Sequence, residues 1–275
     1  MCIPSLRHSL VLAVLASAVG CSSLPPSSSV ATSYATHDYV VAGSGQPVVV
    51  LEAGLGDGRT SWVPVFGRLA EQTTVFAYDR AGYSGSRSAE TRRDGLAIVR
   101  ELRATLLAVG LGPPYVLVGH SLGGSYMELY ARMFPGEVSG LVLVDARHPE
   151  FTQRCLAEEA RFCEPPPLLV SLLPEAARRE LAAAEATESE VLAAGPMQDI
   201  PTVVLTGMSK TVEGEKFRSV WLETQKELAG MSSLSRHDVC DYCGHYIHRD
   251  DPDRVIDAVL EVVDFARRRS SRAGS

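Results

Sequence analysis

The chain has 275 residues, 45% of them hydrophobic, which is enough apolar material to bury the core of one large domain or of two small ones. Its formal net charge of −7 is spread along the sequence without an acidic tail or a basic stripe. This distribution argues against a nucleic acid as the partner, because proteins that bind nucleic acids concentrate positive charge on one surface.

Residues 1–21 have the plan of a secretory signal peptide. A basic start at Arg7 precedes the apolar run LVLAVLASAVG, which is shorter than the about 20 residues of a spanning helix. The run ends in AVGC and resembles a bacterial lipoprotein box, which predicts a lipid-modified Cys21 that anchors an exported protein to the cell envelope. An uncleaved apolar anchor and a plain secretory cleavage are the alternatives. The serine- and proline-rich residues 22–36 are predicted to be a flexible linker.

Export affects the interpretation of the remaining cysteines, because disulfides persist in oxidising compartments. Apart from Cys2 and Cys21 in the signal-like segment, the cysteines are Cys155, Cys163, Cys240 and Cys243. The two local pairs, Cys155 with Cys163 and Cys240 with Cys243, are the simplest of the possible connectivities, and the pairing stays open. The CxxC spacing of the second pair is also typical of a redox site or of half a zinc site, but the sequence has no second CxxC. We therefore expect structural disulfides, with neither a metal nor a cofactor.

From about residue 37 onwards, strand-like and helix-like segments alternate. The strand-like segments are short, rich in β-branched residues and apolar on both faces, which is typical of a buried parallel sheet. They cover 47–54, 73–82, 114–120, 139–146 and 200–207, and amphipathic stretches lie near 61–71, 92–109, 123–133, 215–229 and 252–268. This alternation predicts an α/β fold, a doubly wound and mostly parallel sheet with helices on both faces.

Residues 148–196 interrupt this alternation. A run of three prolines is followed by charged, alanine-rich sequence with helical character. We expect an inserted helical cap over the strand ends, within one domain of residues 37–275. Its apolar residues would line an acyl pocket or form the core of the cap, and they include Phe151, Phe162 and the run 168–173.

The segment YVLVGHSLGG, residues 115–124, places one serine between two glycines where a buried strand meets a helix. In this context Gly-x-Ser-x-Gly is typical of a nucleophile elbow, a sharp turn that lifts the hydroxyl above the sheet. The helix N-terminus then directs backbone N–H groups at the same space, where they stabilise an oxyanion. Ser121 is the predicted nucleophile, and Leu122 is predicted to supply one oxyanion donor. A glycine-rich turn that only packs tightly is the alternative.

Five segments together resemble the α/β-hydrolase superfamily of serine esterases and lipases, over roughly residues 38–268. They are LEAGLGDG, AYDRAGYSGS, VGHSLGG, LVLVDARHPE and CGHYIHRDDPDRV. The resemblance implies a nucleophile, an acid and a histidine in that chain order. In that fold, aspartate nucleophiles define the dehalogenase and epoxide-hydrolase branches, so the serine at position 121 disfavours both.

The resemblance places the catalytic base in the loop after the last strand, often as Gly-His before a final helix. Gly244-His245 fits this place, because RHDVC is the predicted last strand and Asp250-Asp251-Pro252 begins the predicted helix. An imidazole accepts and returns a proton near neutral pH, as an activated serine requires. His245 is therefore the predicted base. His248 is its main rival, and His148 and His237 are further candidates.

The acid has two candidate sources. Most relatives take it from the loop after the strand that is predicted here as IPTVVLTG, but the residues MSKTVEGEKF that follow contain no aspartate, only Glu213 and Glu215. Asp145 ends the preceding strand LVLVD, and a carboxylate at that sheet edge can accept the Nδ1 proton of the histidine. We prefer Asp145 on geometry and keep Glu213 as the alternative acid.

The second oxyanion donor is expected from the loop that follows residues 47–54. Leu55 occupies the place after the His-Gly pair of the family, but that pair reads Ala53-Gly54 here. Glu52, at the end of an apolar strand, either pairs with a buried arginine such as Arg80 or faces water.

These residues predict hydrolysis of a small-molecule carboxylic ester through an acyl-enzyme. A peptidase, thioesterase or lactonase of the same fold is the alternative, and so is a non-catalytic binding protein of the cell envelope. Acyl-chain preference and oligomeric state do not follow from the sequence.

Overall fold

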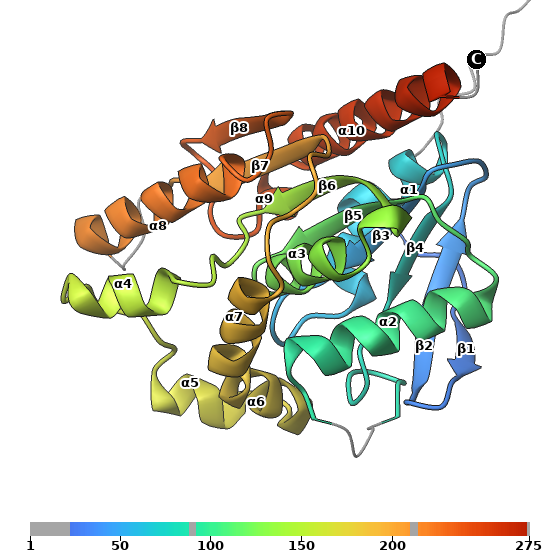
Figure 1. Cartoon of the computed structure of the whole chain (residues 1–275). Coiled ribbons are helices and arrows are strands. Elements are labelled where there is room, and N and C mark those ends of the chain that lie inside the picture. The colour runs from blue at the N-terminus through green and yellow to red at the C-terminus, as the bar shows by residue number, and fades with distance from the viewer. Residues whose placement is uncertain (1–22, 88–91, 210–213, 274–275) are drawn as a thin grey trace, which may run out of the picture.

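The computed structural model describes residues 23–87, 92–209 and 214–273. One twisted sheet crosses the molecule, with helices on both of its faces (Figure 1). Its strand order is β1-β2-β4-β3-β5-β6-β7-β8; the pairs β1–β2 and β2–β4 are antiparallel and the other neighbours are parallel. The strands are β1 (Ser28–Ala31), β2 (Thr36–Ala42), β3 (Val48–Glu52), β4 (Val75–Tyr78), β5 (Tyr115–His120), β6 (Val138–Val144), β7 (Thr202–Gly207) and β8 (Ser235–Cys240). The predicted fold class is confirmed.

The central strands are apolar on both faces because each face is covered by helices. In β3 every residue is buried, and consecutive residues belong to different cores. Val49 and Leu51 pack into the core under α1 (Val63–Ala70) and α10 (Pro252–Ala273). Val48 and Val50 pack into the core under α2 (Gly95–Val109) and α3 (Leu122–Met133). The alternation of side chains along each strand thus supplies both layers, and the parallel direction of the central strands places their carboxyl ends at one edge.

Four short helices form the cap between β6 and β7. They are α4 (Phe151–Ala157), α5 (Pro167–Leu172), α6 (Glu175–Ala182) and α7 (Ala184–Ala193). Helix α7 packs against α2 and α3, and α4 packs against α8 (Gly214–Ala229), whereas α5 extends outward at the lower left of Figure 1. The cap is therefore packed on the sheet domain through α7 and through α4.

Both local disulfides are present, Cys155–Cys163 at the start of the cap and Cys240–Cys243 between β8 and α9 (Ile247–Asp250). The second bond removes the two thiolates that a zinc site would need. A group of His148, Glu150 and Glu227 also has metal-ligand chemistry. Arg154 forms ion pairs with both of its glutamates, so that part of their negative charge is already neutralised.

The prediction of a flexible linker over residues 22–36 is wrong for part of that segment. Ser28–Ala31 form the edge strand β1 and pair with Thr36–Tyr39 of β2. Their side chains are mostly exposed, because the pairing uses main-chain groups and needs no apolar residue. Low hydrophobicity therefore did not exclude a strand at the sheet edge.

The predicted signal peptide and Cys21 lie outside the described residues. Within residues 23–87, 92–209 and 214–273, no helix combines the length and the apolar character needed to cross a membrane.

Candidate active site

Ser121 lies at the sharp junction between β5 and α3, with φ of 53° and ψ of −124°. Few residues other than glycine adopt this backbone conformation, and it persists only where the surroundings hold it. Here the Ser121 N–H donates to the Val144 carbonyl at 3.2 Å, and the Ser121 carbonyl accepts from the Arg147 N–H at 3.0 Å. The turn is therefore fixed against the end of β6.

The flanking glycines are required by close backbone approach. A Cβ on Gly119 would lie 2.6 Å from the Gly123 carbonyl oxygen. A Cβ on Gly123 would lie 2.5 Å from the Ala53 carbonyl oxygen, at the end of β3. The Gly-x-Ser-x-Gly sequence thus brings the β3 loop against the turn that carries Ser121.

His245 and Asp145 meet at the same edge of the sheet. The Nδ1 atom of His245 lies 2.7 Å from Oδ2 of Asp145. The other carboxylate oxygen, Oδ1, accepts from the Gly207 N–H and from Nε1–H of Trp221, both at 2.9 Å. Asp145 is 3% exposed, so these donors fix the carboxylate and it in turn orients the imidazole. Ser121, Asp145 and His245 line one cavity.

The other histidine candidates lie elsewhere. His248 is fully buried, and its Nε2 lies 2.9 Å from the Ser61 hydroxyl, which also accepts from Arg249 at 3.1 Å. Burial lowers the pKa of His248 to about 3, so the ring is neutral.

The two remaining candidates are bound to other partners. Nε2 of His237 lies 2.8 Å from the Thr206 hydroxyl, and that of His148 lies 3.7 Å from Glu227. Glu213, the alternative acid, lies outside the described residues. Of the predicted catalytic side chains, the structure thus brings together Ser121, His245 and Asp145.

His120 was not singled out from the sequence, although it stands inside the elbow motif. Its Nε2 donates to the main-chain carbonyl of His245 at 2.9 Å, and the two rings are 4.7 Å apart. Burial lowers the pKa of His120 well below its usual value, and the nearby His245 acts in the same direction. A neutral His120 therefore supports the loop that carries His245.

The predicted oxyanion donors lie on two sides of Ser121. Leu122 begins α3, and in the described part of the chain no group accepts its N–H or that of Leu55. A Cβ on Gly54 would lie 3.2 Å from the Ser121 Cβ, so the loop before Leu55 passes directly beside the serine. Two free N–H groups beside a serine are what a developing oxyanion requires.

Arg80 binds two carbonyl groups of this loop. Its Nη1 donates to the Ala53 carbonyl at 2.7 Å, and its Nη2 donates to the Gly54 carbonyl at 2.8 Å. The C=O and N–H of a trans peptide point in opposite directions, so the Leu55 N–H faces away from Arg80. Arg80 thus leaves that N–H available to the cavity.

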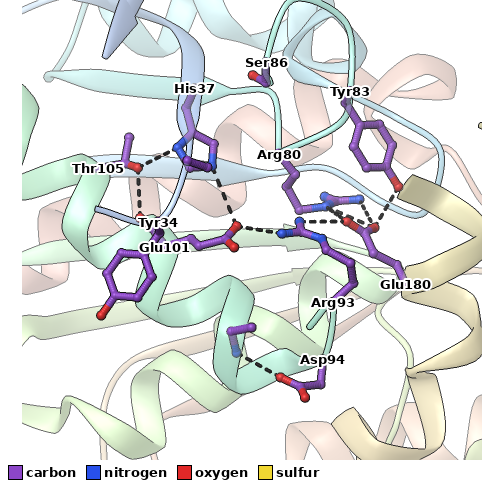
Figure 2. Close-up of polar contacts among 12 residues, drawn as sticks. Tyr34, His37, Arg80, Tyr83, Ser86, Arg93, Asp94, Glu101, Thr105 and Glu180 are labelled. Carbon is purple, nitrogen blue, oxygen red and sulfur yellow. Dashed lines mark hydrogen bonds and ion pairs between the residues drawn. The ribbon is translucent and has the colours of Figure 1, made fainter. Parts of the chain in front are cut away.

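Arg80 belongs to a buried network that includes the cap (Figure 2). Its guanidinium pairs with Glu52 of β3 at 2.6 Å and with Glu180 of α6 at 2.9 Å. Glu180 also accepts from the hydroxyl of Tyr83 at 2.7 Å and from Arg93 at 3.2 Å. Of the two possibilities for Glu52, pairing with Arg80 is therefore the correct one. The network ties the cap to the oxyanion loop.

The cavity beside Ser121 has a volume of about 420 Å³. Its walls come from the cap and from α8 and are mainly apolar, with Phe151, Phe162, Leu169, Met208, Phe217 and Trp221 among the lining residues. Of the cap residues expected at an acyl pocket, Phe151, Phe162 and Leu169 line this cavity, whereas Leu168 and Leu172 do not.

Comparison with known proteins assigns this chain to a family. Residues 48–258 match the alpha/beta hydrolase family. The uncharacterized protein YqjL of Bacillus subtilis is 28% identical over 238 residues, which cover 80% of this chain and 85% of YqjL.

Solved structures agree in fold. A protein of Acinetobacter baumannii proposed to be a lipase (lip1) has a TM-score of 0.70 at 19% identity, covering 89% of this chain and 92% of its own. A thermophilic esterase of Thermogutta terrifontis has a TM-score of 0.67 at 21% identity, and the match covers 88% of this chain and 99% of the esterase. The epoxide hydrolase CorEH has a TM-score of 0.63 at 21% identity, and the match covers 86% of this chain and 98% of CorEH. These neighbours share the fold and differ in chemistry, so the reaction must be argued from the residues.

Proposed function

The chain belongs to the alpha/beta hydrolase family, and we propose that it is a serine hydrolase that cleaves carboxylic esters through an acyl-enzyme on Ser121. The observation that carries this proposal is the 2.7 Å contact between His245 and Asp145 in the cavity that Ser121 also lines. A serine, a histidine and a buried carboxylate in this arrangement form the machinery of nucleophilic acyl transfer.

In the first step, His245 accepts the Ser121 proton while Oγ attacks the ester carbonyl carbon. The carbonyl oxygen gains negative charge, which the N–H groups of Leu55 and Leu122 stabilise. Asp145 holds the imidazole through Nδ1 and stabilises the imidazolium. The tetrahedral intermediate then expels the alcohol, which leaves with the proton that His245 carries. The products are the free alcohol and an acyl group bound to Ser121.

In the second step, a water molecule takes the place of the alcohol. His245 accepts one of its protons, and the hydroxide attacks the acyl carbon. The Ser121 oxygen then leaves with that proton, which frees the carboxylic acid and restores the enzyme. No cofactor enters this sequence.

The identity of the nucleophile favours this chemistry over that of the epoxide hydrolase neighbour. The epoxide-hydrolase branch of the fold attacks with an aspartate, whereas this chain has Ser121 at the elbow. The same triad also serves amide, thioester and lactone cleavage, which are the alternatives within the family.

We also propose that the protein is exported and anchored by a lipid on Cys21. Two disulfides support export, because such bonds persist in oxidising compartments. The signal-like residues 1–21 support it from the sequence.

The experiment that tests the proposed reaction is hydrolysis of 4-nitrophenyl esters from acetyl to palmitoyl by the full chain and by Ser121→Ala. We expect turnover by the wild type that is lost in the variant. Equal inactivity of both folded proteins toward every ester would overturn the esterase proposal, and amide and thioester substrates would then be tested.

A further inference from the structure

Two arginines line the mainly apolar cavity beside Ser121, and among the residues that the structure describes only one of them has an acidic partner. Arg147 pairs with Glu188 of α7, with 2.9 Å between Nε and Oε1. Within the described ranges Arg218 forms no ion pair, and its Nη2 donates to the Met208 carbonyl at 2.6 Å. Its Nε is buried and has no acceptor in the described part of the chain. The wall of the cavity therefore carries a positive charge whose hydrogen bonding is incomplete.

This charge is unusual for an apolar wall. A guanidinium stays protonated at any physiological pH, so Arg218 cannot reduce its desolvation cost by losing a proton. Buried or half-buried charges are normally paired, and donors without acceptors at such positions are rare. Glu164 also lines the cavity, but it is exposed and does not pair with Arg218.

The position of Arg218 connects it to the catalytic groups. It lies three residues before Trp221 on α8, hence on nearly the same helix face. Trp221 donates to Asp145, and Phe217 packs against Trp221 with their rings stacked 6.0 Å apart. This face of α8 thus carries the support for the catalytic acid, an apolar wall and the unpaired arginine.

We propose that Arg218 is a specificity-determining residue that binds a carboxylate on the ester substrate. The substrate class would be anionic esters, which carry a free carboxylate besides the ester carbonyl. This inference rests on the proposed ester hydrolysis and specifies its substrate. A carboxylate matches the planar fork of a guanidinium and would supply the missing acceptor, while the aromatic wall contacts the carbon chain between the two groups.

The test compares esters in pairs in which one member has a carboxylate where the other has an uncharged group. Mono-4-nitrophenyl glutarate and 4-nitrophenyl pentanoate place the charge on the acyl side, and 4-acetoxybenzoate and its methyl ester place it on the leaving group. For wild type we expect kcat/KM to favour the acid by about tenfold or more in at least one pair, the scale of a charge-assisted hydrogen bond. Arg218→Met should reduce this ratio to within about twofold of unity, and Arg218→Gln should do the same if the first variant fails to fold.

Arg147→Met is the matched control, because Arg147 lines the same cavity but already has a carboxylate partner. It should retain the preference for the acid. The proposal is overturned if wild type shows no preference, if Arg218 variants keep it, or if the loss occurs only in the Arg147 variant.

A binding measurement separates this proposal from that of ester hydrolysis. Calorimetry would compare glutarate binding by Ser121→Ala with binding by the Ser121→Ala/Arg218→Met double variant. Should no ester be hydrolysed, a tenfold or greater loss of glutarate affinity in the double variant would preserve the anion site while the esterase proposal fails. Equal affinity, or no binding by either protein, would overturn the site.

Discussion

Nδ1 of His245 lies 2.7 Å from Oδ2 of Asp145, although the two residues are 100 positions apart in the chain. The carboxylate comes from the end of β6, one strand before the place from which most relatives take it. The shift is possible because β6 and β7 are parallel neighbours whose ends meet at one edge. Gly207, at the end of β7, contributes an N–H to this carboxylate instead of an acid to the histidine.

Replacing Asp145 by asparagine should lower kcat by about 10³- to 10⁴-fold, because the amide no longer fixes the required tautomer or stabilises the imidazolium. The measurement is ester hydrolysis at saturating substrate, with circular dichroism to establish folding. Asp241→Asn is the control, since Asp241 is exposed in the loop before His245. A kcat within twofold of wild type for Asp145→Asn would move the role of the acid to another residue, with Glu213 the next to test.

Glu180→Ala should destabilise the protein by about 3–5 kcal/mol, because it leaves Arg80 and Arg93 buried with one partner fewer each. Urea unfolding measures this change. Glu261→Ala is the matched control, since it breaks an exposed pair with Arg236 and should cost less than about 1 kcal/mol. Similar losses for the two variants would mean that the network of Figure 2 contributes no more than a surface ion pair.

Stability should fall in acid because of the buried histidines. The pKa of folded His248 is lowered from 6.5 to about 3, so between these values the unfolded chain binds a proton that the folded chain does not. The free energy of unfolding therefore decreases as pH falls through this window. At about 1.4 kcal/mol per pH unit, His248 alone accounts for about 2 kcal/mol between pH 6.5 and about pH 5.

The variant His248→Asn isolates this contribution. Its unfolding free energy should fall less than that of the wild type over the same interval, by about 2 kcal/mol. The remaining acid sensitivity would include His120, whose pKa burial also lowers. Identical pH dependence of variant and wild type would contradict the role of His248.

Cys21→Ser should abolish incorporation of labelled palmitate by bacterial cells that express the full chain, because the lipid would be attached to that thiol. Cys2→Ser is the control and should keep the label. Labelling of the Cys21 variant at the wild-type level would contradict the anchor and leave secretion or an uncleaved apolar segment as the explanation.

The parts of the fold that follow from local sequence were predictable. The buried central strands are short runs of apolar and β-branched residues, and the elbow is recognisable because its two glycines and its serine stand within residues 119–123. His245 was distinguishable from His248 by its place after Gly244, and the structure shows the physical difference, since one ring lines the cavity and the other is buried against Ser61.

The features that the sequence did not reveal depend on distant partners. Glu180 meets Arg80 across 100 residues, and nothing near either residue indicates the pairing. In the sequence Trp221 is one apolar residue of an amphipathic helix, and only the structure shows its contact with Asp145. The edge strand β1 depends on main-chain pairing, which leaves almost no trace in side-chain pattern.

The most direct test of the central claim is mass spectrometry of the full chain after reaction with a fluorophosphonate. Such a probe phosphonylates a serine that a neighbouring base activates. We predict one adduct, on the peptide that contains Ser121, with labelling lost in His245→Gln and retained in Ser125→Ala. An unlabelled wild-type protein, or an adduct on another serine, would contradict the proposal that Ser121 is the nucleophile.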